Sequence, residues 1–115
     1  MTDSLFTRII KGELPSEMLH EDEHCVVIRD INPQAPVHLL VIPRKQIPTL
    51  AEAQADDEPL LGHLMLVAAR VAREHGVGEG FRLVINNGES VGMTVYHLHL
   101  HVMGGFRSGE AGMAD

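Results

Sequence analysis

The segment His97-Leu98-His99-Leu100-His101-Val102 alternates imidazole and aliphatic side chains without a break. Successive side chains of a β-strand point to opposite faces of the sheet. We therefore expect a strand over residues 95–103 with three histidines on one face and three aliphatic side chains on the other. In a chain with eight histidines among 115 residues, chance would produce this pattern in fewer than roughly one case in a hundred. The histidine face is expected to hold a functional site.

Three chemical interpretations of this face are open. The histidines can simply be solvated, or His99 can share a metal ion with one neighbour. A metal site built from all three is strained, because the Cα atoms of His97 and His101 lie roughly 13 Å apart along a strand. The third interpretation is nucleophilic catalysis on phosphorus, for which a neutral imidazole nitrogen is well suited near pH 7. We favour the nucleophile and expect no metal and no other cofactor.

Nucleophilic catalysis gives each histidine a different expected role. His99, in the middle, can donate its Nδ1–H to a backbone carbonyl, which leaves Nε2 free to attack. The neighbouring imidazoles of His97 and His101 oppose protonation of His99. One of these imidazoles can bind a phosphate oxygen or protonate the leaving group. His38 stands alone within an apolar run and suits either a supporting place beside the others or that of a hydrogen-bonded core histidine.

The remaining sequence predicts an α+β fold. Runs of aliphatic and β-branched residues bounded by turn residues predict four further strands, which we place at residues 18–22, 24–31, 37–42 and 81–86. Five short strands with helices between them favour an antiparallel sheet with its helices on one face. The last strand is apolar enough to pair edge to edge with a second copy of the chain.

Two main helices are expected. Ser4 can cap a short helix that stops at Gly12, with an apolar face made of Phe6, Ile9 and Ile10. The longer helix begins near Asp56-Asp57-Glu58-Pro59, where acidic side chains and a proline suit the first turn, and ends at Gly76. Its apolar stripe is expected to comprise Leu60, Leu61, Leu64, Met65, Ala68, Val71 and Ala72.

Composition limits the classes of protein. Nine basic against sixteen acidic side chains give a net charge of −7, which argues against nucleic-acid binding. Cys25 is the only cysteine, which excludes an intrachain disulfide and a zinc site built on several cysteines. Neither a signal peptide nor a membrane span is recognisable. We expect a single domain over residues 1–115, with its core at about 4–105 and a flexible tail at 106–115, in a cytoplasmic protein with no membrane partner.

Several segments beyond the histidines resemble a known family. His97-Leu98-His99-Leu100-His101-Val102-Met103 matches the His-x-His-x-His-x-x signature, with apolar x, of the histidine triad (HIT) superfamily of nucleotide hydrolases and transferases. Three more segments resemble its Hint branch: Leu5-Phe6-Thr7-Arg8-Ile9-Ile10-Lys11-Gly12-Glu13-Leu14-Pro15, Asp30-Ile31-Asn32-Pro33-Gln34-Ala35-Pro36-Val37-His38 and Leu61-Gly62-His63-Leu64-Met65. The resemblance covers roughly residues 4–105.

The resemblance implies a purine nucleoside phosphoramidase. Such an enzyme hydrolyses purine nucleoside 5′-monophosphoramidates, including aminoacyl forms, to the nucleoside monophosphate and an amine. It also implies a homodimer in which two five-stranded sheets join into one ten-stranded sheet, with one site for AMP or GMP in each subunit.

Residue roles follow from the same resemblance. His99 would be the nucleophile that forms a nucleotidyl-histidine, His101 and His38 would assist proton transfer and phosphate binding, and the carbonyl of His97 would orient His99. The phosphate would be held by Asn86, Gly92, Met93 and Thr94 together with His99 and His101. Asp30 would take the ribose hydroxyls, and Leu5, Phe6, Ile9, Ile28 and Ile31 would hold the base.

Two departures from the family pattern affect what the resemblance implies. Met93 stands where the family commonly has glutamine, so a hydrogen bond to the phosphate or leaving group is lost. Residues 106–115 lack the tryptophan-and-proline ending of animal Hint proteins, so substrate selectivity does not carry over. A Fhit-like dinucleoside polyphosphate hydrolase, a nucleotide-binding regulatory protein with little turnover and a zinc-binding module remain alternatives.

Overall fold

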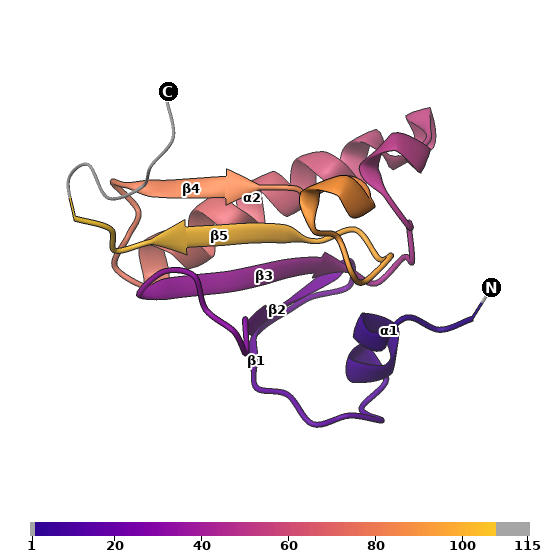
Figure 1. Cartoon of the computed structure of the whole chain (residues 1–115), viewed down its shortest axis with the longest axis horizontal. Coiled ribbons are helices and arrows are strands. Elements are labelled where there is room, and N and C mark those ends of the chain that lie inside the picture. The colour runs from indigo at the N-terminus through magenta and orange to yellow at the C-terminus, as the bar shows by residue number, and fades with distance from the viewer. Residues whose placement is uncertain (1, 108–115) are drawn as a thin grey trace.

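A computed structural model describes residues 2–107 of the chain. They form a five-stranded sheet flanked by a short and a long helix (Figure 1). The strand order is β1-β2-β3-β5-β4, and every neighbouring pair is antiparallel. The elements are α1 (Leu5–Ile10), β1 (Met18–Glu21), β2 (Cys25–Arg29), β3 (Val37–Pro43), α2 (Glu58–Glu74), β4 (Phe81–Val84) and β5 (Leu100–Gly104). The predicted α+β fold with an antiparallel five-stranded sheet and two main helices is confirmed.

The two helices lie on opposite faces of the sheet, so the expectation of helices on one face is wrong. Alternate residues of β2 and β3 pack into two separate hydrophobic cores, one on each face of the sheet. Val27, Leu39 and Val41 pack with α2, whereas Val26, Ile28, Leu40 and Ile42 pack with Phe6 of α1. The cause is that β2 and β3 are apolar on both faces, so a helix must pack on each face to shield it from water.

Both helices begin and end as their sequences predict. The Ser4 side chain accepts a hydrogen bond from the Thr7 N–H and caps α1. Pro59 lies in the first turn of α2. Gly76 follows the end of that helix with a positive φ of 79°, a conformation that favours glycine. The buried stripe of α2 differs from the predicted one at two positions: Val67, which was not predicted, is buried, whereas Met65, which was, is 49% exposed.

The last strand is shorter than predicted and lies inside the sheet. β5 covers Leu100–Gly104 rather than residues 95–103. Leu98 donates its N–H to the carbonyl of Ile47 at 2.7 Å, so this part of the chain bonds to the β3–α2 connection and leaves the ladder. β5 is bordered by β3 and β4, and it therefore has no edge for a second copy. The edges of the sheet are β1 and β4.

No helix among residues 2–107 is long and apolar enough to span a membrane. Residues 108–115, which make up most of the expected flexible tail, lie outside the described residues.

Candidate active site

The triad segment keeps its alternation although half of it is irregular. Leu98, Leu100 and Val102 all enter the core beneath α2. The three histidines lie on the other side, with Phe6 of α1 in edge contact with His97 and His99. The rings of His99 and His101 lie next to each other, with their centroids 5.1 Å apart.

His97 is an anchor buried behind the cavity wall. Its Nε2 lies 2.7 Å from the carbonyl oxygen of Pro43, and since a carbonyl only accepts, Nε2 must carry the proton. Its Nδ1 then accepts from the Ser4 hydroxyl at 2.6 Å. Burial lowers the pKa of His97, which is consistent with a neutral ring.

The same hydroxyl ties His97 to α1. Ser4 caps α1 and bonds His97, while the side-chain oxygen of Gln46 accepts from the Ser4 N–H at 2.8 Å and the Thr7 hydroxyl at 2.7 Å. The amide of Gln46 also donates to the carbonyl of Thr2. Sequence reasoning found Ser4 only as a helix cap and missed Gln46, for which the local sequence carries no signal.

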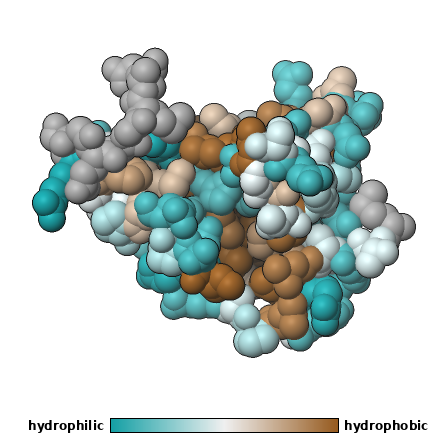
Figure 2. Space-filling view, viewed as in Figure 1, coloured by the Kyte–Doolittle hydropathy of each residue, from teal (hydrophilic) through white to brown (hydrophobic). Residues whose placement is uncertain are grey.

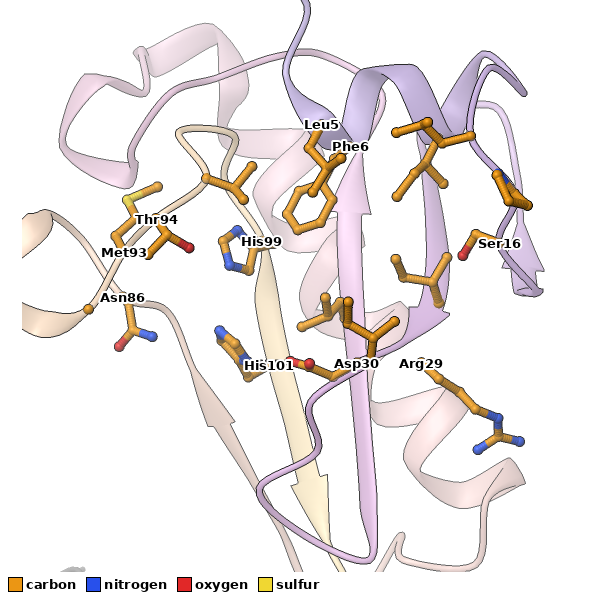
Figure 3. Close-up of a pocket in the computed structure, with 18 residues that line it drawn as sticks. Leu5, Phe6, Ser16, Arg29, Asp30, Asn86, Met93, Thr94, His99 and His101 are labelled. Carbon is orange, nitrogen blue, oxygen red and sulfur yellow. Dashed lines mark ion pairs between the residues drawn. The ribbon is translucent and has the colours of Figure 1, made fainter.

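His99 is oriented by the backbone of His97. Its Nδ1 lies 2.7 Å from the His97 carbonyl oxygen, so Nδ1 carries the proton and Nε2 keeps its lone pair. The His99 ring lines the cavity beneath the Phe6 ring (Figure 3). Burial lowers its pKa, opposed by the hydrogen bond to the His97 carbonyl and by the charge of Asp30. The ring is therefore a neutral base near pH 7.

His38 and His101 form a directed hydrogen-bond chain. The backbone N–H of Gln34 donates to Nδ1 of His38 at 2.9 Å, which leaves the His38 proton on Nε2. That nitrogen lies 2.8 Å from Nδ1 of His101, so Nδ1 of His101 accepts and its Nε2 carries the proton. The Nε2 atom of His101 is buried and has no partner among residues 2–107. At the cavity wall, His101 thus presents an N–H donor without an acceptor in the described part of the chain.

Asp30 adds a negative charge to this chain. Its Oδ2 lies 3.3 Å from Nε2 of His38 and 3.9 Å from Nδ1 of His101. Burial, and to a smaller extent the nearby His99 and His38, lower the pKa of His101 to about 4, while Asp30 acts in the opposite direction. Burial also lowers the pKa of His38.

The side chains of Asp30, His38 and His101 also have ligand atoms within 4.8 Å of one another, as a metal site would require. The proton that His38 donates to His101 already joins the two facing nitrogens. Their arrangement suits proton transfer better than metal binding.

A cavity of about 460 Å³ opens in front of these histidines. Figure 2 shows apolar side chains gathered around a hollow on this face of the molecule. The volume falls in the range of small-molecule sites. All ten residues expected to contact the phosphate or nucleoside besides the histidines line it, together with His99 and His101: Leu5, Phe6, Ile9, Ile28, Asp30, Ile31, Asn86, Gly92, Met93 and Thr94. His38 and His97 lie behind this wall.

The cavity has an apolar end and a polar end. α1 and β2 supply aliphatic and phenyl side chains at one end, whereas His99, His101, Asn86 and Thr94 converge at the other (Figure 3). Ile31 is 99% exposed and forms part of the rim. Six further lining residues were missed from the sequence: Leu14, Pro15, Ser16, Arg29, Leu40 and Val95.

The loop before the triad approaches the polar end in a left-handed turn. Gly92 has φ = 89° and follows a short 3-10 helix at Glu89–Val91. A side chain there would meet no atom within 4 Å, so the backbone conformation and not space favours glycine. Met93 is buried, and its sulfur accepts from the Gly88 N–H.

Comparisons with known proteins agree with this geometry. Residues 11–108 match the HIT domain family. The chain is 53% identical over 103 residues to a HIT-like protein of Synechocystis, with 90% of each chain covered. It is 41% identical over 104 residues to the purine nucleoside phosphoramidase of Escherichia coli, covering 90% of this chain and 87% of that one.

Solved structures give the same result. A HIT family hydrolase from Clostridium thermocellum superimposes with a TM-score of 0.89 at 41% identity, covering 95% of this chain and 96% of the other. A HIT family hydrolase from Legionella pneumophila gives a TM-score of 0.88 at 42% identity, covering 91% and 95%.

Proposed function

This chain belongs to the HIT domain family, and from that premise we propose that it hydrolyses the P–N bond of purine nucleoside 5′-monophosphoramidates through a covalent intermediate on His99. One observation carries the proposal. His99 offers an unprotonated Nε2 and His101 a protonated Nε2 at the polar end of one cavity. A nucleophile and an acid side by side are what an exchange at phosphorus requires.

The first step forms a nucleotidyl-histidine. Nε2 of His99 attacks phosphorus, the P–N bond breaks, and the leaving nitrogen takes the proton from Nε2 of His101. A proton taken up from solvent with the anionic substrate replaces it, so that His101 stays neutral and Nε2 of His38 keeps its proton in the 2.8 Å hydrogen bond. The His99 ring becomes positively charged, and the His97 carbonyl that accepts from its Nδ1–H stabilises that charge.

The second step reverses these transfers. Water attacks phosphorus, the proton that it loses leaves through Nε2 of His101 to solvent, and the bond to His99 breaks. The products are the nucleoside monophosphate and an amine, and all the histidines return to their starting state. No step in this sequence draws on a metal ion.

Substrate binding is proposed to follow the two ends of the cavity. The carboxylate of Asp30 can accept from two adjacent ribose hydroxyls, and the apolar end suits a flat purine ring. Asn86, Thr94 and backbone N–H groups near Gly92 are proposed to hold the phosphate oxygens. The 41% identity to a protein named purine nucleoside phosphoramidase supports this substrate class.

The test is the hydrolysis of adenosine 5′-phosphoramidate in the presence of EDTA, measured as the formation of AMP. Wild-type protein should release AMP, and His99→Ala should be slower by at least about 10⁴-fold while still binding AMP. His75→Ala, at the end of α2 and outside the cavity, is the matched control and should keep full activity.

Unchanged turnover in His99→Ala would disprove the mechanism. Failure of the wild type to release AMP would disprove the proposed substrate class. Diadenosine triphosphate and tetraphosphate, assayed in parallel, distinguish a polyphosphate hydrolase from a phosphoramidase. AMP binding without turnover on any of these substrates would indicate a regulatory protein.

A further inference from the structure

A second cluster of metal-ligating side chains lies on the opposite side of the sheet from the catalytic cavity. It is formed by His20 at the end of β1, Asp22 in the β1–β2 turn and Cys25 at the start of β2, with His63 on α2 facing them. Cys25 belongs to the core beneath α2. None of the four lines the cavity of the proposed active site.

From this cluster we propose a binding site for a zinc-like divalent cation, with His20, Asp22 and Cys25 as ligands and His63 as the fourth. The nitrogen, carboxylate oxygen and sulfur of the first three lie within 4.8 Å of one another. Nε2 of His63 lies 2.8 Å from the same Asp22 oxygen that contacts His20. This proposal is independent of the proposed function.

The carboxylate of Asp22 is oriented in advance. Its Oδ1 accepts the backbone N–H groups of His24 and Cys25 at 2.7 and 2.9 Å. Its Oδ2 is thereby aimed at His20 and His63, both at 2.8 Å, and at the Cys25 sulfur at 3.6 Å. Three protons therefore converge on one anionic oxygen, in the place where a cation would hold all four groups together.

The charge of the cluster fits a cation. The Asp22 carboxylate is an anion that accepts hydrogen bonds from His20, the His24 backbone and His63. The Cys25 thiol is buried and donates to Asp22, so it carries its proton before a cation binds. Binding must therefore displace the thiol proton to solvent and leave the proton of each imidazole on Nδ1, so that Nε2 can bind the cation.

The donor set selects the metal. One thiolate, two imidazoles and one carboxylate are the ligands of tetrahedral zinc, whereas calcium and magnesium require several oxygen ligands. Entry from solvent is open, because the His63 and Asp22 side chains are 35% and 26% exposed. A bound ion would join the β1–β2 turn to α2.

Cobalt(II) titration of the full chain, purified without metal, tests the site. We expect one equivalent to bind with the intense visible bands of tetrahedral coordination and a thiolate-to-cobalt charge-transfer band, and Zn²⁺ to displace it. Cys25→Ser should abolish the charge-transfer band, and His20→Ala should weaken binding at least about tenfold. His75→Ala is the matched histidine control, and His99→Ala tests for binding at the triad instead; both should titrate like the wild type.

Two results of the cobalt titration would overturn the proposal. One is the absence of a tetrahedral cobalt spectrum in the wild type. The other is a spectrum that survives in Cys25→Ser but disappears in His99→Ala. Because Cys25 is buried, the wild-type melting temperature gives a second readout that needs no variant: Zn²⁺ should raise it, and the rise should be lost in His20→Ala, at a partly exposed position. An equal rise in both proteins would contradict the site.

Discussion

At the level of single atoms, the histidines of the cavity differ in which ring nitrogen carries the proton. His99 presents a lone pair because the His97 carbonyl holds its other nitrogen. His101 presents an N–H because His38 donates to its other nitrogen. Two chemically identical side chains thus acquire opposite roles from their backbone and side-chain partners.

This division of roles makes His101→Ala sensitive to the leaving group. A substrate with a basic alkylamine leaving group needs a proton in the transition state, so kcat should fall by about 10²- to 10⁴-fold. A substrate whose leaving group departs without protonation should be affected far less. The measurement is kcat across leaving groups of graded pKa, with His75→Ala as control. An equal loss for every leaving group would contradict an acid role for His101.

Much of the cavity was predictable residue by residue, because spacing and family resemblance are local properties of the sequence. The structure brings Asp30, His38, His99 and His101 together as expected. It also holds partners that no local pattern indicates. The Gln46 side chain that supports Ser4, and the Gln34 N–H that sets the tautomer of His38, act across loops. The fourth ligand of the proposed cation site was missed for the same reason, since His63 lies 41 residues from Asp22.

At the level of elements, the residue that caps α1 also supports the segment that carries the three histidines. Ser4→Ala removes the cap and leaves Nδ1 of His97 without its closest donor. We expect stability to fall by about 1–2 kcal/mol, measured by urea unfolding. Because the His97 carbonyl orients His99, kcat should fall by about tenfold or more. Thr49→Ala is the control, since Thr49 precedes a short helix without a side-chain hydrogen bond. A normal kcat in Ser4→Ala would show that α1 and the triad act separately.

The last strand shows where element prediction succeeds and fails. Alternation of apolar and polar side chains predicts which residues face the core, and that result holds for residues 98–102. It does not predict hydrogen-bond partners. Before Leu100, the His97 side chain bonds to the carbonyl of Pro43 at the end of β3 and the Leu98 N–H bonds to Ile47, outside the ladder of the sheet. These contacts exist only once β3 and its following loop are in place.

At the level of the whole molecule, the homodimer stays a prediction. Since β5 is internal, a continuous ten-stranded sheet must form through β1 or β4. β4 carries Phe81, Leu83 and Val84, which are only partly buried in one chain. Light scattering should give twice the chain mass of 12.6 kDa. A mass of one chain at every concentration would contradict pairing of the sheets.

The buried histidines also make global stability depend on pH. The pKa values of His38, His97, His99 and His101 are lowered from 6.5, chiefly by burial. In the unfolded chain these histidines bind protons below about pH 6.5, whereas in the folded chain they resist protonation. The unfolded state therefore holds more protons in this window, so the free energy of unfolding must decrease as the pH falls from 6.5 towards the lower, folded-state values.

His101 allows this effect to be measured. With a folded pKa of about 4 against 6.5 unfolded, it should account for about 2 kcal/mol of the stability lost between pH 7.5 and pH 5. His101→Gln cannot titrate, so its urea-unfolding free energy should fall by about that much less over the same interval. His75→Gln changes a histidine outside the cluster and should follow the wild type. Parallel pH curves for the wild type and His101→Gln would mean that the pKa of His101 is not lowered in the folded protein, and the neutral hydrogen-bond chain from His38 to His101 would then lose its basis.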